Sequence, residues 1–268
     1  MSRRSVFRTC FITVVLVMLL SISAMANTWG PQLKAATSWQ KIDVTNAPDN
    51  TMLHKLVVPS DGVMYFSGVE YSSYSDSMYG LSFSLLNSSY TPINRYGSST
   101  TYVNGADQNS SSYYRVYALK KGIYYLRVTG TKNYRIIGKF KAVADQGKAK
   151  KKKGTNLKRG KVMTALFAAG ERYSKAEWFK IKVTKSRKIK LTVLVYGDAS
   201  YRVYLYGPKP YKKGDSGTYL TESNCGTITY GIRKGFSSKL KKLNKGTYYV
   251  KVVRTSNDTS GYCSLKWK

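Results

Sequence analysis

Few side chains in this sequence could carry out acid-base or nucleophilic chemistry. His54 is the single histidine, and the alternation of its segment places it on the same face as Leu56 and Val58, which predicts a histidine at the margin of a core. A Ser-His-Asp or Cys-His arrangement would have to use His54, and no sharp nucleophile turn is visible in the first half of the chain. The 13 acidic residues are scattered singly. The sequence therefore predicts that the protein is not an enzyme.

Metal ligands are equally sparse. A zinc site rich in histidine needs a second histidine, and the two cysteines of the second half, Cys225 and Cys263, cannot alone supply four ligands. Calcium is the remaining alternative, since the stretch "NAPDN" at 46–50 and the preceding Asp43 offer oxygen ligands. The same Asn and Asp side chains also stabilise an ordinary polar turn, and we favour the turn. No cofactor is predicted.

Positive charge is the strongest signal in the composition. The chain has 268 residues with 45 Lys and Arg against 13 Asp and Glu. Residues 27–147 carry a net charge of +5, whereas residues 148–268 carry +24. A net charge of this size on a small domain exceeds what solubility requires, and it favours contact with a polyanion.

Basic and aromatic side chains alternate with apolar ones in the second half, so strand phase turns them outward. This set comprises Trp178, Lys180, Lys182, Lys188, Lys190, Tyr249 and Lys251. If their strands are neighbours, ammonium groups and flat rings would share one surface. Such a surface can neutralise a polyanion and stack on sugar rings or bases. The alternative is a solvated lysine face.

Residues 147–161, "GKAKKKKGTNLKRGK", hold eight basic residues and no acid. Like charges extend such a segment, and basic blocks commonly contact anionic surfaces. The expected polyanion contacts here are Lys150, Lys151, Lys152, Lys153, Lys158 and Arg159. A flexible spacer that happens to be basic is the alternative, and both can hold together.

The elements that position these residues repeat along the chain. "GIYYLRV" at 122–128 returns as "GTYYVKV" at 246–252, "KLVVPSDGVMYFS" at 55–67 aligns with "KIKVTKSRKIKLT" at 180–192, and "LSFSLLN" at 81–87 aligns with "YRVYLYG" at 201–207. Apolar residues alternate with polar ones throughout, as in half-buried strands, and only 162–177 hints at a helix. The sequence predicts an all-β protein of two tandem antiparallel β-sandwich, jelly-roll-like domains.

The N-terminus is typical of a secretory signal peptide. Basic residues precede the apolar run "FITVVLVMLLSIS" and the small-residue site "AMA", which predicts cleavage after Ala26. We expect a first sandwich over 27–146, a basic linker over 147–161, and a second sandwich over 162–268. The mature protein should be extracellular or associated with the cell surface, without a membrane span. Cys225 and Cys263 could form one disulfide there, or remain two partly buried thiols.

These features together resemble the bacterial pre-peptidase C-terminal domain, a β-sandwich module related to the collagen-binding domains of clostridial collagenases. The matching segments are "WFKIKV", "KIKLTV", "YRVYLYG", "LNKGTYYVKV" and "YCSLKW" in the second copy. "LHKLVV", "LSFSLLN", "LKKGIYYLRV" and "YRIIGKF" match in the first. The resemblance implies a β-sandwich module of the kind that accompanies secreted peptidases, although no peptidase is present in this chain.

The sequence thus favours a secreted, non-enzymatic module that binds an anionic extracellular polymer through the second domain. The partner would be an anionic polysaccharide, a cell-wall polymer or a nucleic acid. A collagen-like matrix-protein or carbohydrate binder, in which exposed rings matter more than charge, is a second hypothesis. An accessory protein for a secreted partner and a hydrolase with an unrecognised site are the third and fourth.

Overall fold

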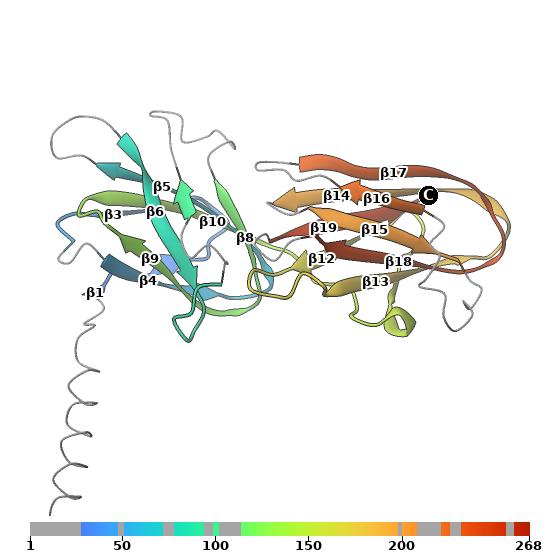
Figure 1. Cartoon of the computed structure of the whole chain (residues 1–268), viewed down its shortest axis with the longest axis horizontal. Helices are drawn as coiled ribbons and strands as arrows, with labels where there is room; N and C mark the ends of the chain where they lie inside the picture. Colours follow the sequence, from blue (N-terminus) through green and yellow to red (C-terminus); the bar gives the residue numbers. More distant parts are fainter. Residues whose placement is uncertain are drawn as a thin grey trace, which may run out of the picture.

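The computed structural model describes residues 28–47, 51–71, 78–93, 99–101, 114–197, 200–207, 221–225, 232–255 and 260–268. The expected signal peptide lies outside these residues. Strands dominate the described chain, and a short 3-10 turn, η2 (Lys151–Lys153), interrupts them. Within the same ranges, no helix is both long and apolar enough to cross a membrane. The prediction of an all-β fold is confirmed, and the strands form two groups along the long axis (Figure 1).

The first group, here called the first sandwich, is built from β1 (Thr28–Trp29), β2 (Leu33–Lys34), β3 (Gln40–Val44), β4 (Thr51–Val58), β5 (Gly62–Tyr71), β6 (Met78–Leu86), β7 (Ser99–Thr101), β8 (Arg115–Leu119), β9 (Gly122–Thr129) and β10 (Tyr134–Ala142). They form a continuous ten-stranded sheet in the order β1-β4-β9-β6-β5-β10-β3, and β2, β7 and β8 branch from it. β6 links two layers because one end pairs with β5 and the other with β9. The layers enclose one apolar core.

The second group, the second sandwich, contains β11 (Thr155–Asn156), β12 (Val162–Phe167), β13 (Ala176–Val183), β14 (Arg187–Gly197), β15 (Tyr201–Tyr206), β16 (Thr221–Cys225), β17 (Ile232–Leu243), β18 (Gly246–Arg254) and β19 (Gly261–Trp267). One sheet has the order β11-β13-β18-β15-β16 and the other β12-β19-β14-β17. Their pairings are antiparallel except for the short parallel pair of β11 with β13. A single core lies between the two sheets.

The period of two in the sequence places side chains as expected. The buried members include Ile181, Val183, Ile189, Leu191, Val193 and Val195, each at most 2% exposed. Lysines alternate with them and face solvent or the sandwich edge. The helix hinted at over 162–177 is wrong, because 162–167 form β12, which pairs with β19 along its whole length. Burial of Ala165, Leu166 and Phe167 in the assembled sheets outweighs the local helical preference.

The repeated seven-residue phrase occupies the same place in both sandwiches. β9 lies between β4 and β6, and β18 lies between β13 and β15. The registers also agree, since Lys55 pairs with Tyr125 in the first sandwich and Lys180 pairs with Tyr249 in the second. The first tyrosine of each phrase packs against or within the core, while the second is half-buried on the outer face. The repeat therefore encodes a central strand and its outer surface.

The two sandwiches touch through a small apolar cluster. It comprises Val63, Val116, Ala118 and Val143 from the first sandwich and Leu166 and Tyr262 from the second. The backbone N–H of Ala118 donates to Oγ of Ser260 at 3.0 Å, and its carbonyl accepts from the N–H of Ala169 at 2.8 Å. Side-chain and backbone contacts, as well as the connecting chain, therefore hold the two halves together.

Candidate functional site

His54 is a structural residue of the first core. Its side chain is 0% exposed, Nδ1 lies 2.9 Å from the carbonyl oxygen of Pro31, and Nε2 lies 2.8 Å from the hydroxyl of Tyr134. Burial lowers the pKa of His54 below its ordinary value of 6.5, because the charged imidazolium loses its hydration there. The sequence placed this histidine at the core margin, and the structure buries it completely. A ring enclosed in this way has no access to a substrate.

Acidification should destabilise the protein through His54. The unfolded chain takes up a proton near pH 6.5 that the folded ring resists, so stability is full above that pH and falls as the pH drops below it. The slope contributed by one such group is at most about 1.4 kcal/mol per pH unit. We expect the free energy of unfolding, measured by urea titration at pH 7 and pH 5, to fall more in the wild type than in His54→Gln. Equal falls in both proteins would show that His54 does not resist protonation.

Asp43, the first residue of the candidate calcium stretch, is paired with an arginine. Both carboxylate oxygens of Asp43 accept from Arg135, with Oδ1 2.6 Å from Nε and Oδ2 3.2 Å from Nη2. The backbone N–H of Asn46 donates at 2.9 Å to Oδ1 of Asn133, a residue 87 positions later in the chain. Residues 48–50 lie outside the described chain. Among the described residues, no three His, Cys, Asp or Glu side chains gather as a metal site would need.

Outward residues of three neighbouring strands, together with one lysine of η2, form a surface that we call the aromatic–lysine face. Its members are Lys151, Trp178, Lys180, Tyr204, Tyr206, Tyr249 and Lys251. The register explains their proximity, because Lys251 of β18 pairs with Trp178 of β13 on one side and with Tyr204 of β15 on the other. Tyr249 likewise lies between Lys180 and Tyr206. One cross-strand row therefore has a lysine between two rings, and the next has a lysine beside two neighbouring rings.

The cations of this face lie over the rings. Nζ of Lys251 is 5.7 Å from the ring centroid of Trp178 and 5.5 Å from that of Tyr204. Nζ of Lys151 is 4.7 Å from the centroid of Tyr206 and 5.0 Å from that of Tyr249. Each such pair contributes about 0.5–1 kcal/mol at an exposed site. The rings therefore favour positions of the two ammonium groups over the sheet.

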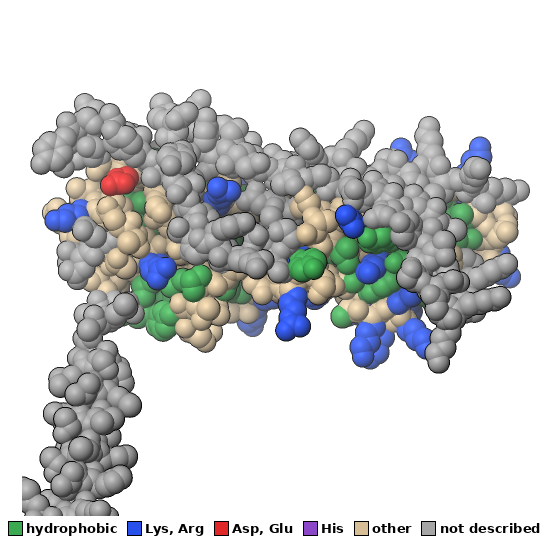
Figure 2. Space-filling view, in the orientation of Figure 1, with side chains coloured by type: hydrophobic (Ala, Val, Ile, Leu, Met, Phe, Trp, Pro, Cys, Tyr) green, Lys and Arg blue, Asp and Glu red, His purple; other side chains and the backbone are tan. Residues whose placement is uncertain are grey.

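Electrostatics at the face favour an added anion. Partial burial lowers the pKa of Lys151 from its ordinary value, because its ammonium has lost some water without full compensation. On the view in Figure 2, Lys and Arg side chains surround a hydrophobic patch over the second sandwich, whereas an acidic side chain lies over the first. None of the seven members of the face is acidic. A bound anion would offset both the desolvation and the mutual repulsion of these lysines.

Residues 147–161 are partly built into the second sandwich. The carbonyl of Lys148 accepts from the N–H of Trp178 at 2.8 Å, and the N–H of Leu157 donates to the carbonyl of Lys180 at 2.7 Å. Leu157 is 2% exposed and belongs to the second core. Of the six linker residues predicted as contacts, Lys151 packs on the rings. Lys150, Lys152, Lys153, Lys158 and Arg159 are exposed.

The predicted surface included two lysines that lie elsewhere. Lys188 and Lys190 are exposed on β14, which belongs to the other sheet of the second sandwich. They therefore do not share a surface with Trp178, Lys180 and the β18 residues, and this part of the prediction is wrong. The alternating pattern turns the lysines of β13 and those of β14 outward. The chain crosses from one sheet to the other in the turn between these strands, so the two sets of lysines face opposite sides of the second sandwich. Lys182 is exposed on β13, one alternate position beyond Lys180.

The two cysteines fall on different sheets. Cys263 is buried in β19 and pairs with Val195 of β14. Cys225 ends β16 in register opposite Tyr201, a member of the same core as Cys263. The side chain of Cys225 lies outside the described part of the chain. The disulfide stays a prediction.

Sequence reasoning missed Tyr204 and Tyr206 as members of the face. The sequence did indicate them, because "YRVYLYG" alternates in the same way as the segments of β13 and β18. Tyr201, Val203 and Leu205 are the buried members of that alternation. It also missed a second aromatic cluster on the first sandwich. There Tyr90 stacks on Tyr125 with centroids 4.6 Å apart, and Trp29 lies 5.6 Å from Tyr125. Tyr125 is the repeat equivalent of Tyr249, so both sandwiches carry rings at the corresponding place.

The chain matches no protein-family model and none of the curated proteins. Among solved structures it is similar to the pre-peptidase C-terminal domain of a collagenase from Bacillus anthracis, at 17% identity and a TM-score of 0.30, over 42% of this chain and 93% of that one. It is also similar to the tandem CBM22-1-CBM22-2 domain of Paenibacillus barcinonensis Xyn10C, at 10% identity and a TM-score of 0.25, over 85% of this chain and 86% of that one. The CUB1-EGF-CUB2 domains of rat MASP-1 are similar at 10% identity and a TM-score of 0.25, over 88% of this chain and 99% of that one. The fold class rests on the strands themselves, and the pre-peptidase C-terminal resemblance stays a prediction.

Proposed function

We propose that this protein is a secreted, non-enzymatic binding module that holds an anionic polysaccharide or cell-wall polymer on the aromatic–lysine face of the second sandwich. The observation that carries this proposal is the pair of ammonium groups, on Lys151 and Lys251, that lie over four rings. Aromatic rings pack against sugar rings, while the ammonium groups neutralise phosphate, sulfate or carboxylate. The exposed Lys150, Lys152 and Lys153 would extend the contact beyond the rings.

Salt dependence tests the proposal. Three cations of the face, Lys151, Lys180 and Lys251, would each release a counterion from the polymer, so affinity should fall with salt at a log-log slope of about −2 or steeper. The measurement is a salt titration of binding to heparin, used as a probe polyanion, beside wall fractions, neutral glycans and DNA. Tight binding to DNA alone would replace the polysaccharide with a nucleic acid. Absence of binding to every polyanion would contradict the proposal.

A second candidate is a carbohydrate or matrix-protein binder that relies on exposed rings. The cluster of Trp29, Tyr90 and Tyr125 favours it, because Trp29 is 54% exposed and Tyr90 is 44% exposed. Contacts of this kind depend on apolar and stacking interactions and therefore survive high salt. Binding to a neutral glycan that persists at about 0.5 M salt, well beyond the screening of exposed charges, and is lost in Trp29→Ala, would support this second function.

A further inference from the structure

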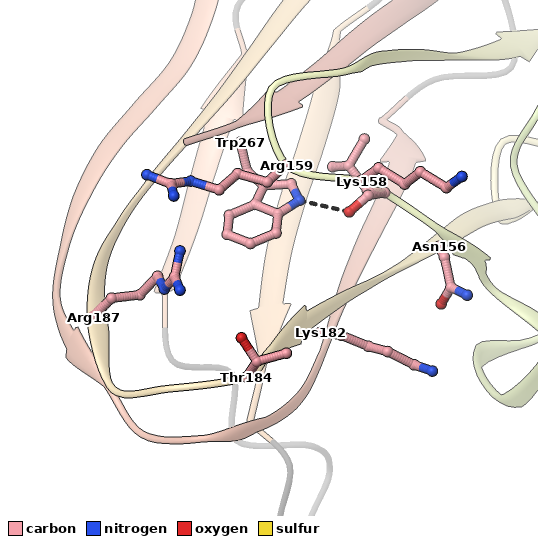
Figure 3. Close-up of a pocket in the computed structure, with 8 residues that line it drawn as sticks. Asn156, Lys158, Arg159, Lys182, Thr184, Arg187 and Trp267 are labelled. Carbon is pink, nitrogen blue, oxygen red and sulfur yellow. Dashed lines mark hydrogen bonds between the residues drawn. The ribbon is translucent and has the colours of Figure 1, made fainter.

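A pocket of about 370 Å³ opens at one end of the second sandwich, between its two sheets. Its lining comprises Asn156, Leu157, Lys158, Arg159, Lys182, Thr184, Arg187 and Trp267. Four of these eight side chains are cationic and none is acidic. Figure 3 shows the guanidinium groups of Arg159 and Arg187 on one side of the Trp267 ring, and Lys158 and Lys182 on the other with their ammonium groups turned outward.

Arg187 stands where an apolar side chain is expected. Along β14 it has the same parity as Ile189, Leu191 and Val193, which all point into the core. A bulge in the pairing of β14 with β17 begins at this residue, where the pairs Arg187 with Leu243 and Ile189 with Leu240 leave an extra residue on β17. Bulges commonly occur where a sheet re-aims a side chain. The sequence thus places a charge on the inner side of a strand, at the open end of the sandwich.

The guanidinium of Arg187 has a buried N–H group, at Nε, without a hydrogen-bond acceptor among the described residues. A buried donor on a permanently charged group is unfavourable unless an acceptor, preferably anionic, completes it. Trp267 forms a fixed wall beside it, because its indole Nε1 donates to the carbonyl of Leu157 at 2.5 Å and its side chain is 4% exposed.

Two of the four cations of the pocket have no cationic counterpart in the first sandwich. In the alignment of 55–67 with 180–192, Arg187 corresponds to Gly62, Lys182 to Val57 and Thr184 to Pro59. A Cβ added at Gly62 would lie 2.5 Å from the ring of Phe140, so that end of the first sandwich is filled. Arg187 and Lys182 are therefore particular to the second copy and do not follow from the shared fold.

We infer that this pocket binds a single tetrahedral oxyanion carried on a small group, such as a sulfate or phosphate ester of a sugar. The planar guanidinium forks of Arg187 and Arg159 match two oxygens of such an anion, and the hydroxyl of Thr184 can donate to a third. Lys158 and Lys182 add positive charge at the mouth. The site is separate from the aromatic–lysine face and takes one ester group, not a length of polymer.

The test uses the full mature chain and two probes, glucose 6-sulfate and glucose 6-phosphate, with glucose as the neutral comparison. NMR follows the Nε–H signal of Arg187 during each titration. We expect at least one ester to shift that signal and bind, with affinity at least ~10-fold weaker in Arg187→Gln. Lys188→Gln, which removes the same charge from the neighbouring outward position, should bind like the wild type. Whichever of the two esters binds more tightly shows whether the pocket prefers a sulfate or a phosphate group.

Two further readouts separate this inference from a structural role and from polymer binding. Without ligand, Arg187→Gln should unfold at no lower temperature than the wild type, because it removes a buried donor that lacks a partner. Lys180→Glu/Lys251→Glu should retain ester binding even though it loses heparin binding. The inference is overturned if neither ester binds the wild type, or if both bind Arg187→Gln and Lys188→Gln equally. Either result would leave heparin binding on the face unaffected.

Discussion

Reversing Lys180 and Lys251 together to glutamate should weaken heparin binding by at least ~30-fold. The two ammonium groups lie on adjacent strands, Lys251 over Trp178 and Tyr204, and Lys180 opposite Tyr249. The double change shifts the local charge by four units at the surface that we propose as the contact. At about 0.5–1 kcal/mol per unit for partly exposed charges, the loss is about 2–4 kcal/mol, and its lower end corresponds to the stated factor. Fluorescence anisotropy with a labelled heparin oligosaccharide at low salt measures it.

The matched control reverses Lys188 and Lys190 instead. This variant has the same net charge as the first, but its changes lie on the opposite sheet of the second sandwich. A polymer held on the aromatic–lysine face would sense them only through the screened long-range field, so we expect a change of at most about 3-fold. If both variants lost affinity equally, total charge and not the arrangement of rings and lysines would determine binding.

Phe179→Ala should lower the free energy of unfolding of the second sandwich by about 3–5 kcal/mol. Phe179 lies on β13 between Trp178 and Lys180, but it points the other way and is 0% exposed within the second core. Its removal leaves a cavity between two sheets that cannot close without moving several strands. Urea denaturation followed by circular dichroism measures the loss. The variant should also lose heparin binding under conditions where it unfolds.

Phe179→Leu is the control for this core prediction. It keeps most of the apolar volume, and we expect a loss below about 1.5 kcal/mol together with wild-type heparin affinity. Equal losses from leucine and alanine would show that packing at Phe179 does not stabilise the sandwich. Loss of binding in a folded Phe179→Leu protein would show that the core position affects the face directly.

The alternating pattern predicted the burial of the aliphatic side chains of β13 and β14. Ile181, Val183 and Leu191 occupy the core as expected, and the rings and lysines between them face outward. The pattern could not predict which sheet each strand joins. Lys180 and Lys190 have the same parity and the same chemistry, yet the turn after β13 places them on opposite sides of the molecule. Sheet membership depends on long-range pairing, which short-range periodicity does not contain.

The internal repeat contained information on where residues 147–161 lie in the fold. Leu157 follows Leu33 by 124 residues, the same offset as the repeated phrase. In the structure Leu33 pairs in parallel with Leu56 of β4, and Leu157 lies at the same edge beside β13. Extending the repeat backward would have predicted an edge element here. The contact of Lys151 with Tyr206 and Tyr249 could not be predicted, since it depends on the path of a turn between two sandwiches.

The pocket lined by Arg159 and Arg187 could not be predicted from the alternating pattern. Arg187 was not singled out, because a cation beside the lysine-rich turn looks like one more solvated charge in the sequence. The burial of its Nε and the wall formed by Trp267, which lies 80 positions later, become visible only once β14 and β19 are placed in one sheet. Residues that break the inner parity of a strand are therefore good places to search for sites.

Lysine footprinting tests the proposed surface most directly. Exposed amines are acetylated with and without heparin, and the extent of modification at each lysine is read by mass spectrometry. The account predicts that heparin protects Lys151, Lys180 and Lys251, while Lys188 and Lys190 are acetylated equally in both samples. Protection of Lys188 and Lys190 with continued modification of Lys180 and Lys251 would contradict it.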